Sequence, residues 1–170
     1  MPSPMSISIR LKPYLVDFMI SIYGPQPIVF PRKDNFNRIL NKFVEKDPPA
    51  YSNYSRGETN LEIQLPYFED KNVLSNFSLS PVQESVLVSK IENVFKLTFR
   101  DEMDQWLLLG MLKIEAIHLF MEKHAIREDS IDMLLKDYQR FRNCFHQKNA
   151  YKRKKILSVK SKFCPVPKQL

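Results

Sequence analysis

The positive charge of this 170-residue chain is concentrated at its C-terminal end. From residue 136 to residue 170 the sequence has eleven Lys or Arg side chains and one acid, Asp137, whereas residues 1–135 have 15 basic and 18 acidic side chains. Because a dense block of like charge repels itself, it is either solvated or neutralised by a polyanion. Aromatic side chains that can stack on bases are interleaved with it: Tyr138, Phe141, Phe145, Tyr151 and Phe163. We interpret this region as a nucleic-acid contact surface.

Several other classes of protein are disfavoured by the composition. The chain is 44% hydrophobic and can bury a core, but it has no long apolar run, no secretory signal pattern and no lipidation motif, so we expect a cytoplasmic protein without a membrane partner. Gly24, Gly57 and Gly110 lie too far apart for a phosphate-binding loop, and we expect no cofactor. Cys144 and Cys164 are expected to be free thiols.

The hydrophobic pattern of the first third predicts a small N-terminal β/α module, residues 1–66. Ser6–Leu11 and residues 61–65 alternate in polarity, which is typical of strands. Helical spacing follows in residues 13–23 and 34–44, with a short apolar stretch between these two segments. The order is therefore strand, helix, strand, helix, strand.

A long helix is predicted next. Ser80, Pro81 and Gln83 provide an N-cap, a first-turn proline and a capping-box glutamine. The apolar spacing continues to a stop at Gly110, with an expected break near residues 98–101.

Two shorter helices, 112–123 and 129–145, complete a three-helix module over residues 67–147. Residues 148–170 lose periodicity and are predicted to form a basic tail. The expected fold class is therefore α+β and mostly helical, with a small β/α module, a helical module and a tail.

The predicted hairpin of residues 112–145 has the layout of a helix-turn-helix motif. Phe120, Ile126, Ile131 and Leu134 fall at the four positions where the two helices of that motif bury apolar groups against each other.

Through the sequence AIHLFMEKHAIREDSIDMLLKDYQRFR, the chain resembles small helix-turn-helix DNA-binding proteins encoded on bacterial mobile elements and phages. The resemblance implies regulation of transcription or replication of a mobile element. The sequence departs from the pattern at two positions: Ala125 stands where glycine is preferred because φ is often positive, and Met121 stands where a small residue is preferred.

Acidic residues open the second helix of this hairpin. Glu128, Asp129 and Asp132 are expected to complement the helix dipole, and in a DNA groove they would repel phosphate. The hairpin is therefore equally compatible with a core element or a protein-binding platform.

Farther along, the same helix has two faces. One is an apolar stripe, predicted to be core: Ile131, Leu134, Leu135, Tyr138, Phe141 and Phe145. The opposite side, which we call the basic face, has residues suited to phosphates and base edges: Lys136, Arg140, Asn143 and Gln147, with Arg142 beside them. The predicted contact surface continues into the tail with Lys148, Lys152, Arg153, Lys154 and Lys155. The alternative interpretation is a solvated basic helix face.

Catalytic patterns are sparse. A nuclease would need clustered carboxylates, and the candidates are Asp101, Glu102, Asp104 and Glu115. The first three do not share a helix face, so a solvated acidic turn is expected and no metal site is predicted. The three histidines show no zinc spacing with the cysteines.

These observations predict a non-enzymatic DNA-binding protein, with DNA preferred over RNA and an N-terminal module for folding or self-association as a homodimer. The alternative is a structural or adaptor protein whose hairpin binds another protein and whose tail attracts RNA. A ribbon-helix-helix dimer through Ser6–Leu11 is also considered, although Arg10 and Lys12 are the only basic residues near that strand.

Overall fold

The protein is α+β and mostly helical, as expected. The computed structural model describes residues 6–43, 45–46, 59–65 and 77–144. The chain divides into two compact units, Met1–Ser130 and Ile131–Leu170, which we call the N-terminal unit and the basic unit.

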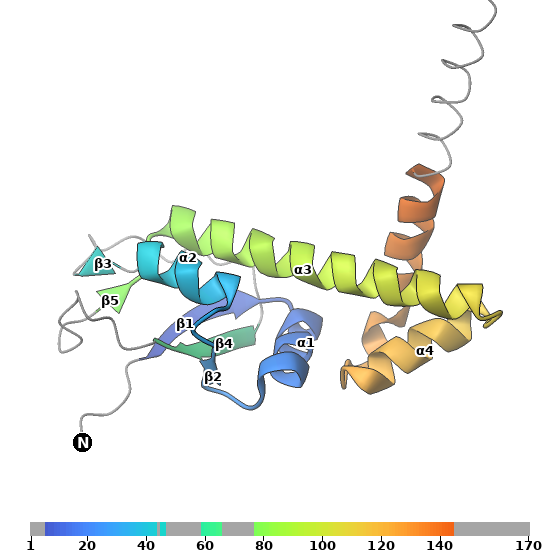
Figure 1. Cartoon of the computed structure of the whole chain (residues 1–170), viewed down its shortest axis with the longest axis horizontal. Helices are drawn as coiled ribbons and strands as arrows, with labels where there is room; N and C mark the ends of the chain where they lie inside the picture. The colour runs from blue at the N-terminus through green and yellow to red at the C-terminus, as the bar shows by residue number, and fades with distance from the viewer. Residues whose placement is uncertain (1–5, 44, 47–58, 66–76, 145–170) are drawn as a thin grey trace, which may run out of the picture. The chain divides into compact units, whose positions relative to one another are not determined.

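The N-terminal unit has a three-stranded sheet with the order β1-β4-β2 (Figure 1). Strand β1 (Ser6–Leu11) pairs antiparallel with β4 (Thr59–Gln64), and β2 (Ile28–Val29) pairs parallel with β4. The two strands predicted from alternation are therefore confirmed, with β4 starting two residues before its predicted apolar positions.

Alternation in these strands places their apolar side chains on one buried face. Ile7 lies opposite Ile63 and Ile9 lies opposite Leu61, and all four are buried. Cross-strand pairs of this kind are the units that stabilise a sheet. A one-residue slip in register would expose the set, so the pattern fixes the pairing.

Two short strands, β3 (Glu45–Lys46) and β5 (Phe77–Ser78), form a second antiparallel pair that the sequence did not predict. Most of the predicted loop 47–60 lies outside the described residues. Strands of two residues carry too little periodicity to be recognised from sequence.

The first two helices begin and end at local signals. Helix α1 (Pro13–Tyr23) has proline in its first turn and ends at Gly24, whose φ is 95°. Helix α2 (Asn35–Phe43) follows Asp34, whose Oδ1 accepts a hydrogen bond from the N–H of Phe36 at 2.7 Å. Asp34 thus acts as the predicted N-cap.

Helix α3 (Pro81–Leu108) starts with the predicted capping box. The N–H of Ser80 donates to Gln83 Oε1 at 2.9 Å, and the N–H of Gln83 donates to Ser80 Oγ at 3.4 Å. The expected break near residues 98–101 is wrong, because α3 is continuous through it. Phe99 lies fully buried in that segment, so packing stabilises the helix where local propensity is weak.

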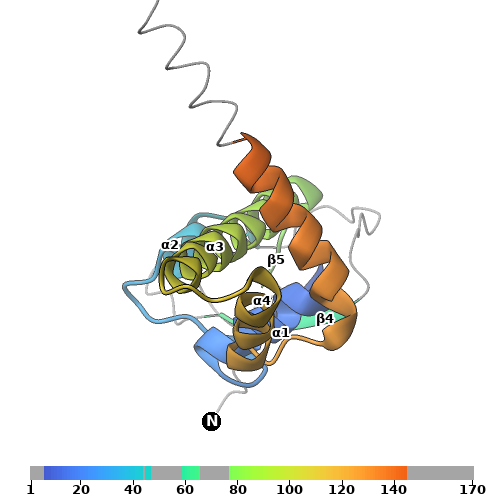
Figure 2. The same cartoon turned by 90° about the vertical axis from the view of Figure 1, so that its right-hand side faces the viewer.

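Four phenylalanines join α1, α3 and α4 (Lys113–Lys123) in one core. Phe18 and Phe95 have ring centroids 5.1 Å apart, and Phe99 and Phe120 have theirs 4.9 Å apart. Helices α1 and α4 accordingly lie on the same side of α3 (Figure 2). This core extends across residue 66, where we expected a boundary between modules.

The residues after α4 form a turn of 3-10 helix, Glu128–Ser130, and then an α-helix over residues 131–144. The predicted start at residue 129 is therefore wrong by two residues, because the first acids of the segment lie in the tighter turn. Residue 145 lies outside the described residues. Among the described helices, none has the length and apolar content needed to cross a membrane.

Candidate nucleic-acid interface

The division into units coincides with the division of charge. Ile131–Leu170 contain eleven basic and two acidic side chains, a net charge of +9. Met1–Ser130 contain 15 basic and 17 acidic side chains, a net charge of −2. A polyanion would therefore be attracted to the basic unit rather than to the N-terminal unit.

Within the basic unit, the helix of residues 131–144 buries the centre of its apolar stripe. Leu134 and Tyr138 are buried, and the rings of Tyr138 and Phe141 are 6.3 Å apart. Ile131 and Leu135 are half-buried, as is Phe141. The stripe thus follows the helical period that the sequence predicted, as far as the described residues extend.

The basic face of the same helix is accessible. Lys136, Arg140 and Asn143 are exposed, and their spacing of four and three residues places them on one side of the helix. Within the described part of the chain, the side chains of Lys136 and Arg140 form no ion pair or hydrogen bond. Arg142 is half-buried and has an interaction of its own. The remaining predicted contact residues lie outside the described residues: Gln147, Lys148, Lys152, Arg153, Lys154 and Lys155.

The acidic residues expected at the start of this helix are divided between two elements. Glu128 and Asp129 are exposed in the 3-10 turn, and only Asp132 lies in the first turn of the α-helix. The expectation that all three belong to one helix start is therefore wrong. Asp132 retains the position where a negative charge complements the helix dipole.

The turn after α4 is a Schellman motif built without glycine. Ala125 has a φ of 49°, its N–H donates to Glu122 O at 3.2 Å, and the N–H of Ile126 donates to Met121 O at 2.9 Å. Ala125 therefore adopts the left-handed conformation for which the helix-turn-helix pattern prefers glycine. The departure at this position is one of residue type and not of backbone conformation.

A polar cluster around the buried His124 connects this turn to α1 and α3, and sequence reasoning missed it. His124, the C-cap of α4, is buried; its Nδ1 lies 2.9 Å from Ser21 Oγ on α1, and its Nε2 lies 3.5 Å from Glu102 Oε1 on α3. Lys123 Nζ lies 2.8 Å from the same Glu102 oxygen. Burial lowers the pKa of His124, while the Glu102 carboxylate opposes that shift.

A second ion pair connects the residues just beyond the turn to α1. Arg127 Nε lies 3.4 Å from Asp17 Oδ2 on α1. Ser21 and His124 are 103 positions apart in the sequence, so no local pattern signals either contact. The only clue in the sequence was that a histidine, His124, lies in the predicted connector two residues before the apolar Ile126.

Three of the acidic residues considered for a nuclease have partners of their own. Asp101 Oδ2 accepts from Gln105 Nε2 at 3.1 Å, and Glu115 Oε2 accepts from the N–H of Leu112 at 3.0 Å. Glu102 belongs to the cluster around His124. In the part of the chain that the structure describes, no three His, Cys, Asp or Glu side chains are grouped to hold a metal ion.

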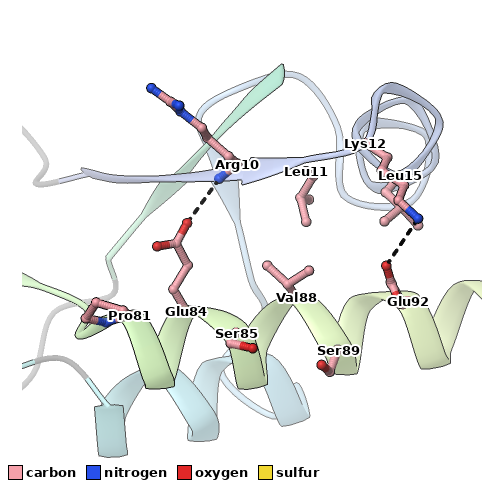
Figure 3. Close-up of a pocket in the computed structure, with 10 residues that line it drawn as sticks. All are labelled: Arg10, Leu11, Lys12, Leu15, Pro81, Glu84, Ser85, Val88, Ser89 and Glu92. Carbon is pink, nitrogen blue, oxygen red and sulfur yellow. Dashed lines mark hydrogen bonds and ion pairs between the residues drawn. The ribbon is translucent and has the colours of Figure 1, made fainter. Parts of the chain in front are cut away.

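A groove of about 300 Å³ runs between β1 and α3 (Figure 3). Two polar contacts cross it: the N–H of Arg10 donates to Glu84 Oε1 at 3.4 Å, and Lys12 Nζ lies 3.8 Å from Glu92 Oε1. Basic and acidic side chains are balanced here, which does not favour a polyanion. Strand β1 pairs with β4 of its own chain along one edge, and the ribbon-helix-helix dimer considered above stays a prediction.

Comparison with known proteins finds no match to this chain among family models, curated proteins or solved structures. The resemblance to helix-turn-helix proteins therefore gains no support from these comparisons.

Proposed function

We propose that this chain is a non-enzymatic DNA-binding protein whose contact surface is the basic face, continued by the charged residues of the C-terminal segment. The observation that carries the proposal is the exposure of Lys136, Arg140 and Asn143 on one side of a helix, in the unit with a net charge of +9. Lys136 and Arg140 have no ion-pair partner among the described residues, so a phosphate would not have to displace one.

The spacing of these residues suits DNA. At about 1.5 Å per residue, Lys136 and Asn143 are separated by about 10 Å along the helix axis, which is roughly three base steps of 3.4 Å. Lysine and arginine bind phosphates, arginine also reads guanine, and asparagine reads adenine. An α-helix fits the major groove of B-form DNA, whereas the major groove of A-form RNA is too narrow for it. This geometry supports DNA over RNA.

The turn between α4 and the helix of residues 131–144 supports a helix-turn-helix interpretation. Its left-handed Ala125 and buried Phe120 and Ile126 correspond to features of that motif. Two residues, His124 and Arg127, connect this turn to α1.

A charge-reversal experiment on the full chain tests the proposal. Lys136→Glu with Arg140→Glu should weaken binding to duplex DNA by at least about tenfold, because each lost phosphate contact also removes counterion release. Fluorescence anisotropy with a labelled duplex measures this loss. The matched control is Lys33→Glu with Lys90→Glu, which makes the same change in net charge at exposed lysines of the N-terminal unit.

Equal losses in the two double variants would mean that net charge alone governs binding, and the basic face would lose its role. Tighter binding of the wild-type chain to duplex RNA than to duplex DNA would contradict the preference for DNA.

The alternative function is an adaptor whose hairpin over residues 112–145 binds another protein. It predicts that the wild-type chain does not bind duplex DNA even at low salt. That result in the anisotropy experiment would contradict the DNA-binding proposal.

A further inference from the structure

The turn between α3 and α4 carries the two most exposed leucines of the described chain, Leu108 and Leu109. Leu108 is 87% exposed, Leu109 80%, Leu112 64% and Ile114 43%. They belong to an almost continuous apolar run, Trp106–Ile114, at the end of α3 farther from the sheet (Figure 1). We call these four residues the apolar tip. Scattered surface leucines are normal, but a contiguous group marks an interaction site.

The backbone of the tip is well determined by its own hydrogen bonds. Gly110, with a φ of 88°, donates to Leu107 O at 3.1 Å, and the N–H of Met111 donates to Trp106 O at 3.2 Å, forming a second Schellman motif. The N–H of Leu112 donates to Glu115 Oε2. The fold of the turn therefore does not depend on burying the leucines within the chain.

The charge around the tip disfavours anionic partners. Residues 101–115 contain four acidic side chains and one basic side chain, Lys113. A nucleic acid or an anionic lipid surface would be repelled by this balance. Lys113 and Glu115 are both exposed at the edge of the tip and carry opposite charges. In a two-fold contact, Lys113 of each copy can therefore pair with Glu115 of the other copy.

The area of the tip fits a homodimer contact. With about 120 Å² for a fully exposed aliphatic side chain, the four residues offer roughly 300 Å². A standard interface buries about 800 Å² on each partner, of which about 65% is apolar in homodimers. The tip thus provides more than half of the apolar area needed, and the half-buried Trp106, Leu107 and Met111 adjoin it.

We infer that the apolar tip is a two-fold contact with a second copy of this chain. Each copy contributes the same residues, with Leu108 and Leu109 at the centre of the contact and Lys113 opposite Glu115 at its edge. The dimer brings two basic units into one particle. Its formation requires no nucleic acid, so it holds or fails independently of the proposed DNA binding.

Analytical ultracentrifugation of the full chain in nucleic-acid-free buffer tests this inference. The wild-type chain should show a concentration-dependent equilibrium between monomer and dimer. Leu108→Ser with Leu109→Ser should raise the dissociation constant at least about tenfold, because the centre of an interface carries most of its binding energy. Helical content should be unchanged, since both leucines lie outside the core.

The matched control is Val82→Ser with Leu97→Ser, which removes two apolar residues that are 73% and 68% exposed on α3 but lie outside the tip. This variant should dimerise as the wild type does. A wild-type chain that stays monomeric, or a tip variant that dimerises as tightly as the control, would overturn the inference. Tip-dependent binding of a monomer to neutral phosphatidylcholine vesicles would also overturn it and assign the tip to a membrane surface.

Discussion

The two units of the chain use their charged side chains in different ways. In the N-terminal unit, several basic side chains are paired with acids on other elements, as Lys123 is with Glu102 and Arg127 with Asp17. In the basic unit, Lys136 has no such partner among the described residues. Charges that are paired within a fold hold its elements in place, whereas unpaired charges on one face are available to a ligand. This difference supports the proposal that the basic unit binds a polyanion, while the ion pairs of the N-terminal unit connect its elements.

The largest expected effect tests the stability side of this comparison. Phe120→Ala should destabilise the N-terminal unit by about 3–5 kcal/mol, because Phe120 is fully buried and touches the rings of Phe95 and Phe99. Urea denaturation followed by circular dichroism measures the change. Leu97→Ala, at an exposed site on α3, should change stability by less than about 0.5 kcal/mol. A similar small effect at Phe120 would show that the aromatic cluster is not the core.

The next largest expected effect tests the proposed DNA binding by the basic unit. Arg140→Ala should weaken binding to a preferred DNA site by about 1–3 kcal/mol and to random DNA by less, while stability stays unchanged. Competition binding with selected and random duplexes gives both values. Equal losses of affinity for the selected and the random duplex would mean that Arg140 contacts phosphate only.

The stability of the protein should depend on pH through His124, which lies in the turn before the basic unit. Burial lowers the pKa of His124 below its usual 6.5, so below that pH the unfolded chain binds more protons than the folded chain. The contribution of His124 to the free energy of unfolding should therefore be fully present above about pH 6.5. It should fall, by at most about 1.4 kcal/mol per pH unit, as the pH drops through the folded pKa.

Urea denaturation of His124→Gln at a series of pH values checks this. The variant should lose that part of the pH dependence, whereas His118→Gln, at an exposed site on the same helix, should keep the wild-type profile. Identical profiles for all three proteins would remove His124 as the group responsible.

The smallest expected effect compares the two Schellman turns. Gly110 and Ala125 both have positive φ, but only alanine carries a Cβ that opposes this conformation. Ala125→Gly should therefore stabilise the protein by up to about 1 kcal/mol, and Gly110→Ala should destabilise it by a similar amount. Thermal unfolding of both variants measures the difference. A loss of stability in Ala125→Gly would mean that the left-handed turn does not limit stability.

Much of the fold could be predicted because its signals are local. The alternation of Ile7 and Ile9, the cap at Ser80 and the stop at Gly110 each depend on a few neighbouring residues. The continuity of α3 could not be predicted, because it depends on the burial of Phe99 against a residue of α4. Tertiary packing there outweighs local propensity.

The candidate interface was predicted in part for the same reason. Helical periodicity alone indicates that Lys136 and Arg140 share a face, and both are exposed. The contact between His124 and Ser21 joins distant parts of the sequence, so no periodic pattern indicates it. The half-burial of Arg142 likewise depends on surroundings that a helix pattern does not specify.

The salt dependence of DNA binding tests the central claim most directly, which is that the basic unit neutralises DNA phosphates. For the full chain, the logarithm of the binding constant should fall linearly with the logarithm of salt concentration, with a slope of about −4.5 if five phosphates are contacted. Lys136→Ala with Arg140→Ala should make that slope shallower by about 1–2. Absence of binding at low salt, or binding that does not change with salt, would contradict the account.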